Sequence, residues 1–396
     1  MHILHVVGAR PNFMKAAPVL RALAPKPGVR QTLVHTGQHY DRIMSDVFFQ
    51  ELEMPQPDCN LEVGSGSHAQ QTAAVLRAFE PVIIERKPDL VLVYGDVNST
   101  VAAALVCSKL GFPVGHVEAG LRSRDRTMPE EINRLLTDQL SDLLFTPSPD
   151  ADENLLHEGV DCSRIHLVGN VMIDTLVRLL PRSEQHRRAN LAAPYILVTL
   201  HRPSNVDDLP WLRELLATLA ELSQHLTVVF PVHPRTRERL SNLTTDAGSH
   251  PRLQLLDPQP YLDFLALQRG AALVITDSGG IQEETTFLGV PCLTVRENTE
   301  RPVTITMGTN QLVGRDLQKL RKAAAEILRV ELEGGTNQAG TESGARESSS
   351  GIETQHQTCH IPLWDGHAAE RIAEIILRRE TINVRTSQRR PKAEAS

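Results

Sequence analysis

The fold of this chain is decided by the stretch Leu90–Gly120, LVLVYGDVNSTVAAALVCSKLGFPVGHVEAG. Two short apolar runs, residues 90–94 and 113–117, stand on either side of a helical pattern at Thr100–Leu110. Brief apolar strands that alternate with helices are typical of parallel sheets covered by helices on both faces. The stretch therefore predicts a strand–helix–strand unit of an α/β fold.

The same alternation continues in both directions along the chain. Apolar runs at 3–7, 32–35 and 143–145 predict further strands of this first series. A second series begins after about residue 185, with strands expected near 195–200, 226–231, 253–256, 272–276 and 291–295. We therefore expect two Rossmann-like, doubly wound α/β domains, residues 1–180 and 190–330, with a cleft between them. The polar stretch Arg182–Asn190 is expected to join them.

The end of the chain departs from this pattern. Gly, Ser, Thr, Glu and Gln dominate residues 331–360, which predicts a low-complexity surface loop. A last helix is expected within residues 361–380, and residues 381–396 form a basic tail. We favour a solvated, frayed end for this tail over contact with a polyanion.

The composition excludes several classes of partner. The 396 residues contain 41 Lys and Arg against 48 Asp and Glu, a net charge of −7, whereas nucleic acids and acidic membranes select basic faces. There is no run of 18 apolar residues that would predict a membrane span. The five cysteines are odd in number, widely spaced and free of CxxC pairs, which indicates reduced thiols in a cytoplasmic protein.

The sequence also lacks the motifs of common metals and cofactors. It contains no HxH or HExxH pair, so a metal site is not expected. It contains neither a Walker motif nor GxGxxG, so a nicotinamide cofactor gains no support. The residues alone therefore support neither a metal site nor a nicotinamide cofactor.

Glycines, histidines and charged residues follow almost every predicted strand. In open α/β sheets, ligands bind at the carboxyl ends of the strands. The residues at these positions are Gly8-Ala9-Arg10-Pro11, Thr36-Gly37-Gln38-His39, Gly95-Asp96, His116–Gly120, His201-Arg202, His233 and Thr276–Gly280. A structural protein needs only turn residues there, so this repetition predicts an active site between the two domains.

The stretch Asp277–Glu284 has the pattern of an anion site. Small residues at a helix start leave backbone N–H groups open to a phosphate, and Glu284, one turn later, is placed to accept bonds from ribose hydroxyls. Helix capping by Ser278 is the alternative, and both can hold at once. Arg10 and Lys15 at the first helix, and Arg301 after the strand at 291–295, also favour an anionic ligand, with surface solvation as the alternative.

Three carboxylates of the first domain, Asp96, Glu118 and Glu130, predict an acid/base set. Carboxylates that converge on one cleft raise one another's pKa values. His201 adds a group that titrates near neutrality. The alternatives are an ordinary helix-start glutamate for Glu130 and a structural role for the histidine.

These motifs together resemble the non-hydrolysing UDP-N-acetylglucosamine 2-epimerases. The matching segments cover residues 1 to about 315 and resume at Asp365-Gly366. They are Gly8–Pro11 with Lys15, Thr36–His39, Gly95-Asp96, His116–Arg122, Pro129–Arg134, His201-Arg202, Pro231–His233, Thr276–Glu284 and Thr299–Pro302. The resemblance implies the two-domain GT-B fold, with the last helix packed back on the first domain.

The resemblance also implies roles for the residues. UDP is expected on the second domain, with His233 near the uridine, Ser278, Gly279 and Gly280 at the diphosphate, Glu284 at the ribose and Arg301 near the phosphates. Arg10, Lys15, Asp96, Glu118 and Glu130 are expected around the sugar, and His201 reaches in from the other side. Gln38, His39 and Arg202 match a second, activating UDP-N-acetylglucosamine site of some bacterial relatives, whereas Ala74, Pro203 and Ser204 depart from it.

The implied reaction interconverts UDP-N-acetylglucosamine and UDP-N-acetylmannosamine for cell-envelope polysaccharide. UDP is eliminated to leave 2-acetamidoglucal and is then added back with a proton on the opposite face. The resemblance implies that this reaction needs no redox cofactor or metal. A homodimer is the expected assembly. Three alternatives stay open: a hydrolysing relative, a GT-B glycosyltransferase and a non-catalytic nucleotide-sugar sensor.

Overall fold

A computed structural model describes residues 1–37, 49–186, 191, 193–232, 234–241, 250–329 and 360–378. The chain divides into two compact units. The first consists of Met1–Pro181 and the chain from Ile361 onward, and the second of Arg182–His360.

The first unit is built on a seven-stranded parallel sheet of order β3-β2-β1-β4-β5-β6-β7. The strands are β1 His2–Val7, β2 Arg30–His35, β3 Cys59–Asn60, β4 Leu90–Tyr94, β5 Val114–Val117, β6 Leu143–Thr146 and β7 Ile165–Leu167. The strand order reverses between β1 and β4, and ligands bind at such a reversal in open α/β sheets. The turns after β1 and β4 are therefore the first places to look for a site.

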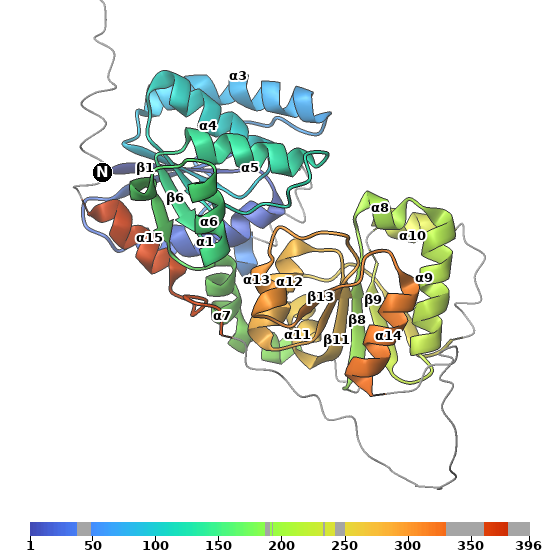
Figure 1. The fold of residues 1–396 in the computed structure, drawn as a ribbon. Helices are drawn as coiled ribbons and strands as arrows, with labels where there is room; N and C mark the ends of the chain where they lie inside the picture. Colours follow the sequence, from blue (N-terminus) through green and yellow to red (C-terminus); the bar gives the residue numbers. More distant parts are fainter. Residues whose placement is uncertain are drawn as a thin grey trace, which may run out of the picture. The chain divides into compact units, whose positions relative to one another are not determined.

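Helices cover both faces of this sheet, with α3, α4 and α5 on one side and α1, α7 and α15 on the other (Figure 1). The helices of the unit are α1 Arg10–Leu23, α3 His68–Arg86, α4 Asn98–Leu110, α5 Pro129–Leu140, α6 Pro149–His157, α7 Val171–Ser183 and α15 Ala368–Leu377. Buried Val, Ile, Leu and Phe side chains of β1, β4, α3 and α4 form one continuous core.

The C-terminal helix α15 is tied to the first unit by polar contacts. Asp174 of α7 accepts hydrogen bonds from the backbone N–H groups of Ala368 (3.1 Å) and Ala369 (2.7 Å), the first residues of α15. The indole N–H of Trp364 donates to the carbonyl of Pro147 (2.9 Å). Distant parts of the sequence therefore complete one unit.

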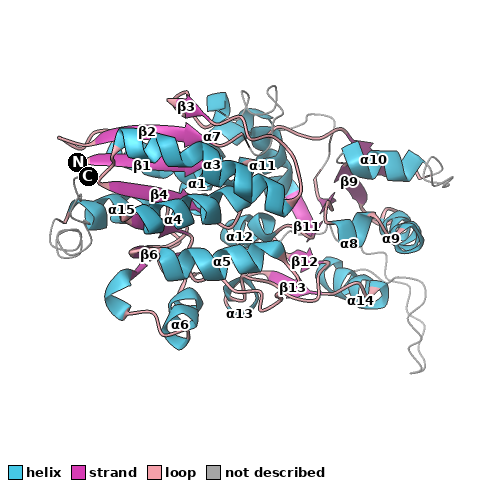
Figure 2. Cartoon of the chain, turned by 90° about the horizontal axis from the view of Figure 1, so that it is seen from above, coloured by secondary structure: helices cyan, strands magenta, loops and turns pink. Residues whose placement is uncertain are grey.

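The second unit repeats the architecture with a six-stranded parallel sheet of order β10-β9-β8-β11-β12-β13. Its strands are β8 Tyr195–Thr199, β9 Thr227–Pro231, β10 Leu253–Leu256, β11 Ala271–Thr276, β12 Cys292–Thr294 and β13 Asn310–Leu312. Its helices are α8 Pro203–Val206, α9 Leu209–Leu222, α10 Pro234–Ser241, α11 Tyr261–Gly270, α12 Gly279–Leu288, α13 Val303–Thr306 and α14 Leu317–Leu328. One core lies between the sheet and α9 with α14, and the other between the sheet and α11 with α12 (Figure 2).

The α/β fold class and the ten predicted strands are confirmed, each within one or two residues. The sequence reading missed β3, β7 and β13, which have only two or three residues each and carry little apolar signal. The expected joining stretch, Arg182–Asn190, begins inside α7, which runs to Ser183. Residues 331–359 and the tail 381–396 lie outside the described residues. No described helix has the length and apolarity that a bilayer crossing requires.

Candidate active site

The turn after β1 is held rigidly by Asn12. Its side-chain oxygen accepts from the N–H groups of Gly8 (3.0 Å) and Ala9 (3.2 Å), and its amide donates to the carbonyl of Tyr94 (2.7 Å) at the end of β4. A Cβ atom at Gly8 would lie 2.3 Å from the hydroxyl of Ser99, so only glycine fits. Arg10 begins α1 immediately after this turn, and its side chain lies outside the described atoms.

Lys15 and Glu118 form a buried ion pair beside this turn. The Lys15 ammonium contacts the Glu118 carboxylate, and the two side chains are 6% and 4% exposed. Glu118 has a backbone φ of +72°, a left-handed conformation that is rare for a residue with a side chain. Its N–H donates to the carbonyl of Phe145 (3.0 Å), which holds the turn in place. Such local strain is found where a side chain must be aimed at a functional position.

Asp96 lies next to this pair, at the end of β4. A Cβ atom on the preceding Gly95 would lie 2.6 Å from the Lys15 ammonium and 3.7 Å from the Glu118 carboxylate, so the two turns approach closely. Arg134 of α5 donates to the Asp96 carboxylate (2.5 Å), and Asn133 donates to its backbone carbonyl (2.8 Å). The structure thus brings Lys15 and Glu118 beside Gly95, which directly precedes Asp96, at the carboxyl edge of the first sheet.

Glu130 occupies the first turn of α5, where the helix dipole favours a negative charge, and its side chain is partly exposed. Its neighbour Glu131 is the buried member of the pair. Glu131 accepts from the N–H groups of Ser123 and Arg124 (2.9 Å each) and from Arg134 (2.8 Å). Burial alone raises the pKa of the Glu131 carboxyl, but these donors outweigh it and hold the pKa below its usual value.

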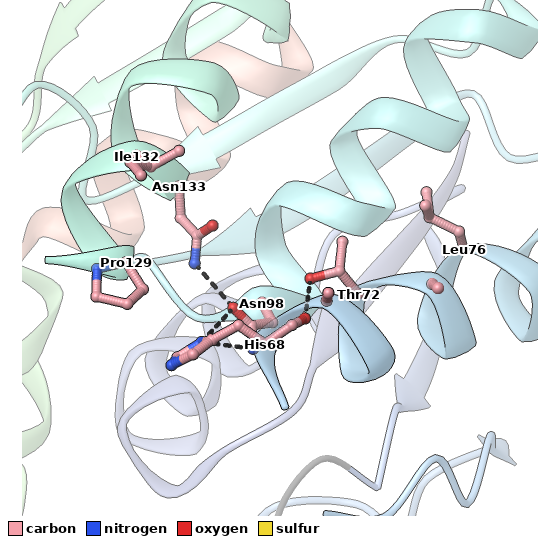
Figure 3. Close-up of a pocket in the computed structure, with 9 residues that line it drawn as sticks. His68, Thr72, Leu76, Asn98, Pro129, Ile132 and Asn133 are labelled. Atoms are coloured by element: carbon pink, nitrogen blue, oxygen red, sulfur yellow. Dashed lines mark hydrogen bonds between the residues drawn. The ribbon is translucent and has the colours of Figure 1, made fainter. Parts of the chain in front are cut away.

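A surface hollow of about 360 Å³ lies beside the carboxylates rather than over them. Figure 3 shows it between α3, which contributes His68, Thr72 and Leu76, and α5, which contributes Ile132. Asn98 and Asn133 form its floor, with a hydrogen bond of 3.2 Å between them. The remaining lining residues, Ala69, Ala73 and Pro129, are apolar. Because the hollow offers few polar groups, we do not assign the nucleotide to it.

In the second unit, His201 is paired with Asp277. The imidazole Nδ1 lies 2.9 Å from the Asp277 carboxylate, which also accepts from the N–H of Arg202 (2.9 Å) and the amide of Asn205 (3.1 Å). Burial raises the pKa of Asp277, but His201 and these donors outweigh it and lower the pKa. The His201 side chain is half exposed, so Asp277 fixes one ring nitrogen while Nε2 is the atom that can reach a ligand.

The start of α12 has the features of an anion site. Ser278 occupies the N-cap position, yet its side chain makes no capping hydrogen bond. A Cβ atom on Gly279 would lie 2.4 Å from the Arg301 guanidinium, so Arg301 packs directly against the first turn of the helix. Glu283 holds Arg301 at 2.7 Å, and Glu300 pairs with it as well. Glycine backbone, a helix N-terminus and a fixed cation therefore coincide.

Glu284 is buried and already has hydrogen-bond partners within the protein, which the sequence did not indicate. It is 2% exposed, and its carboxylate accepts from the hydroxyl of Tyr261 (2.9 Å) and the amide of Gln268 (2.5 Å). A ribose contact at Glu284 would therefore share its oxygens with these two donors. Gln38, His39 and His233 lie outside the described residues, and Arg202 donates through Nε to the carbonyl of Asp277 (3.1 Å).

Sequence reasoning missed the residues that hold the site together. They are Asn12, Glu131, Asn133, Arg134 and Asp277. Asp277 directly precedes the glycines, and Glu131 and Arg134 lie one helical turn apart on α5, which is a detectable pairing signal. Their partners, however, come from other strands, so the sequence does not identify them. No group of three or more potential metal-ligating His, Cys, Asp or Glu side chains occurs among the described residues.

The chain is similar to known proteins over most of its length. A family profile described as UDP-N-acetylglucosamine 2-epimerase matches residues 21–377. The chain is 43% identical to a UDP-N-acetylglucosamine 2-epimerase of Methanocaldococcus jannaschii over 83% of this chain and 92% of that protein. It is 44% identical to a UDP-2,3-diacetamido-2,3-dideoxy-D-glucuronate 2-epimerase of Pseudomonas aeruginosa over 79% of this chain and 88% of that protein.

Solved structures give the same result. The M. jannaschii epimerase in complex with UDP-GlcNAc and UDP has a TM-score of 0.79 at 38% identity, covering 95% of this chain and 99% of that chain. The Neisseria meningitidis epimerase bound to UDP-GlcNAc has a TM-score of 0.82 at 30% identity, covering 95% and 100%. Both units thus have the architecture of these GT-B-like enzymes, and the chain belongs to the UDP-N-acetylglucosamine 2-epimerase family.

Proposed function

We propose that this chain interconverts UDP-N-acetylglucosamine and UDP-N-acetylmannosamine by inverting C2 of the sugar. The observation that carries the proposal is the Lys15–Glu118 pair, which lies against the Gly95-Asp96 turn at the sheet edge of one unit. Family membership and an anion site at α12 of the other unit add to it.

The proposed chemistry begins with elimination, because the C2 proton is not next to a carbonyl. A carboxylate of the Asp96, Glu118 and Glu130 set removes the C2 proton, the C1–O bond breaks, and UDP leaves with the bonding electrons. A double bond between C1 and C2 remains, in 2-acetamidoglucal. UDP then adds back to C1 while a proton is delivered to the opposite face of C2, so one proton is removed and one returned.

Electrostatic stabilisation of the departing UDP is assigned to the second unit. The N–H groups at the start of α12 and the Arg301 guanidinium offer positive charge where negative charge develops on the leaving diphosphate. His201, oriented by Asp277, is the group we assign to proton transfer or phosphate contact on this side. Arg10 and His233 are assigned to the substrate on motif position alone, and Gln38, His39 and Arg202 to a regulatory site.

A second substrate has direct support, because a relative of equal similarity acts on a diacetamido-glucuronate. We prefer the N-acetyl sugar, because the family profile and both solved structures described above are those of UDP-N-acetylglucosamine epimerases.

Incubation with each substrate in D₂O, followed by NMR, tests this function. Deuterium at C2 together with UDP-N-acetylmannosamine is the expected result. Deuterium only in the glucuronate sugar would show that this sugar is the substrate. Free N-acetylmannosamine would indicate a hydrolysing enzyme. The absence of exchange in both sugars would contradict catalysis and favour the glycosyltransferase or sensor alternatives.

We also propose a homodimer in which a second copy covers the apolar face of α3 and α5. Ile84, Ile132 and Leu136 are 46–50% exposed on these two helices. Light scattering should give about twice the chain mass of 43.8 kDa. Charged substitutions at Ile132 and Leu136 should yield monomers, whereas the same change at the exposed Ile305 of the second unit should not. A monomeric wild-type protein would exclude this assembly.

A further inference from the structure

His116 is a fully buried histidine with an acceptor at each ring nitrogen. It lies on β5, two residues before Glu118. Its Nδ1 lies 2.6 Å from the Asp138 carboxylate, and its Nε2 lies 2.8 Å from the carbonyl oxygen of Gly95. A neutral imidazole has one N–H and one lone pair, so it would direct a lone pair at one of these oxygens. Both contacts are hydrogen bonds only when both ring nitrogens carry a proton.

The surrounding charges also favour a His116 ring with a proton on each nitrogen. Asp138 also accepts from Arg122 (2.7 Å), and Arg122 pairs with Glu158 (2.7 Å). With an imidazolium at His116, this chain of four groups contains two cations and two anions. With a neutral ring, Asp138 would have Arg122 as its one cationic partner in this chain, and Arg122 is shared with the solvent-exposed Glu158. Burial raises the pKa of the Asp138 carboxyl, but His116 and Arg122 outweigh it and bring the pKa below its usual value.

The two members of this pair reach two different turns. His116 holds the carbonyl of Gly95, whose N–H is bonded to the carbonyl of Val117 (3.0 Å), so both backbone groups of Gly95 are fixed on β5. Asp138 accepts from the N–H of Gly120 (3.1 Å). Asp96 directly follows Gly95, and Glu118 lies two residues before Gly120.

We propose that the buried His116–Asp138 pair is a positioning device for Asp96 and Glu118, with His116 as an imidazolium that holds the Asp96 turn and Asp138 holding the Glu118 turn. The proposal rests on the proposed function, because it assigns these carboxylates to proton transfer. Neither His116 nor Asp138 touches the substrate. Their removal should therefore lower kcat while KM, set largely by UDP on the second unit, changes little.

Three variants test whether the hydrogen bonds of His116 and Asp138 position the two carboxylates. In His116→Gln, the amide can still donate to Gly95, but its oxygen faces the Asp138 carboxylate. In Asp138→Asn, the amide faces the His116 ring and the charge balance is lost. In the double variant, the new amide at position 138 can donate to the new amide oxygen at position 116 and accept from Gly120, and Arg122 keeps Glu158. Thr137→Val is the matched control, since its buried hydroxyl has no hydrogen-bond partner among the described residues.

Each single variant should lose about 10²-fold in kcat, with KM within about twofold, because small misplacements of catalytic groups cost about that much. The double variant should recover at least about tenfold, and Thr137→Val should behave as wild type. UDP binding and a cooperative thermal transition verify that each variant is folded. Single variants with wild-type kcat, a proportional rise in KM, or a double variant no better than the singles would overturn the proposal.

A second measurement does not depend on activity. Long-range ¹H–¹⁵N spectra of histidine-labelled wild-type protein should show one histidine, absent from His116→Gln, with a proton on each ring nitrogen. A single neutral tautomer at His116 would overturn the inference. A wild-type protein that shows this doubly protonated ring yet gives no C2 exchange would contradict only the proposed function.

Discussion

The carboxyl edges of the two sheets differ although the sheets share one architecture. At the first edge, acids pair with cations in a buried network that includes Glu118 with Lys15 and Asp96 with Arg134. At the second edge, the glycine helix start lies against both Arg301 and the Glu300 carboxylate, and Glu283 also pairs with Arg301. We assign the first arrangement to proton transfer and the second to the binding of an anion. A doubly wound sheet thus supplies the position, and the side chains supply the chemistry.

The largest effect that separates the two edges is expected for Asp96→Asn. This change removes a proton acceptor from the first unit, so C2 exchange should fall by about 10²–10⁴-fold. UDP affinity, assigned to the second unit, should stay within about twofold in a calorimetric titration. Glu153→Gln, an exposed acid of the same unit, serves as the control. Exchange near the wild-type rate would remove Asp96 from the acid/base set.

The next effect concerns the stability of the paired charges. Lys15→Met or Glu118→Gln alone leaves a buried charge without its partner, which should cost about 3–5 kcal/mol in urea unfolding. The double variant should recover most of this loss. Glu283→Gln in the second unit should cost less, because Arg301 keeps Glu300. Additive losses for Lys15 and Glu118 would show that the pair is not coupled.

A smaller effect distinguishes ligand binding from helix capping at α12. Ser278 makes no capping bond, so Ser278→Ala should leave the free energy of unfolding within about 0.5 kcal/mol while weakening UDP binding. Asp316 is the matched control, since it caps α14 by accepting from Gln318 (2.9 Å) and Lys319 (3.0 Å). Asp316→Ala should cost about 1 kcal/mol and leave UDP binding unchanged. Equal destabilisation by both would favour the capping role of Ser278.

The smallest effect on the free energy of unfolding at ordinary pH is expected from the titration of Asp138 in the first unit and Asp277 in the second. Both have folded-state pKa values below the reference value of 3.8. Their contribution to stability is therefore fully present above pH 3.8 and is lost as the pH falls through the folded pKa. The difference in unfolding free energy between wild type and Asp277→Asn should therefore stay level from pH 7 to about 5 and shrink at lower pH. Asp277→Asn should flatten the acid decline of the second unit, and an unchanged decline would assign it to other groups.

Much of this molecule could be predicted from local sequence. Apolar runs such as 90–94 and 271–276 are strands because both faces of a parallel sheet are buried, which needs no knowledge of partners. The sequence also shows the glycines that follow the strands. The structure gives the reason for them, because a Cβ atom at Gly8 or Gly279 would have no room. Short edge strands such as β13 were not predicted, because three residues are too few to show an apolar pattern.

The sequence by itself determined the α/β class, the order of the strands along the chain and the set of polar residues at their ends. Only the tertiary structure decided which of these residues meet. Lys15 pairs with Glu118 from a distant part of the chain, His116 joins Asp138 to Gly95, and Glu131 rather than Glu130 is the buried glutamate at the start of α5. The physical reason is that burial makes an unpaired charge costly, so each charge is fixed by partners that distant strands bring near it.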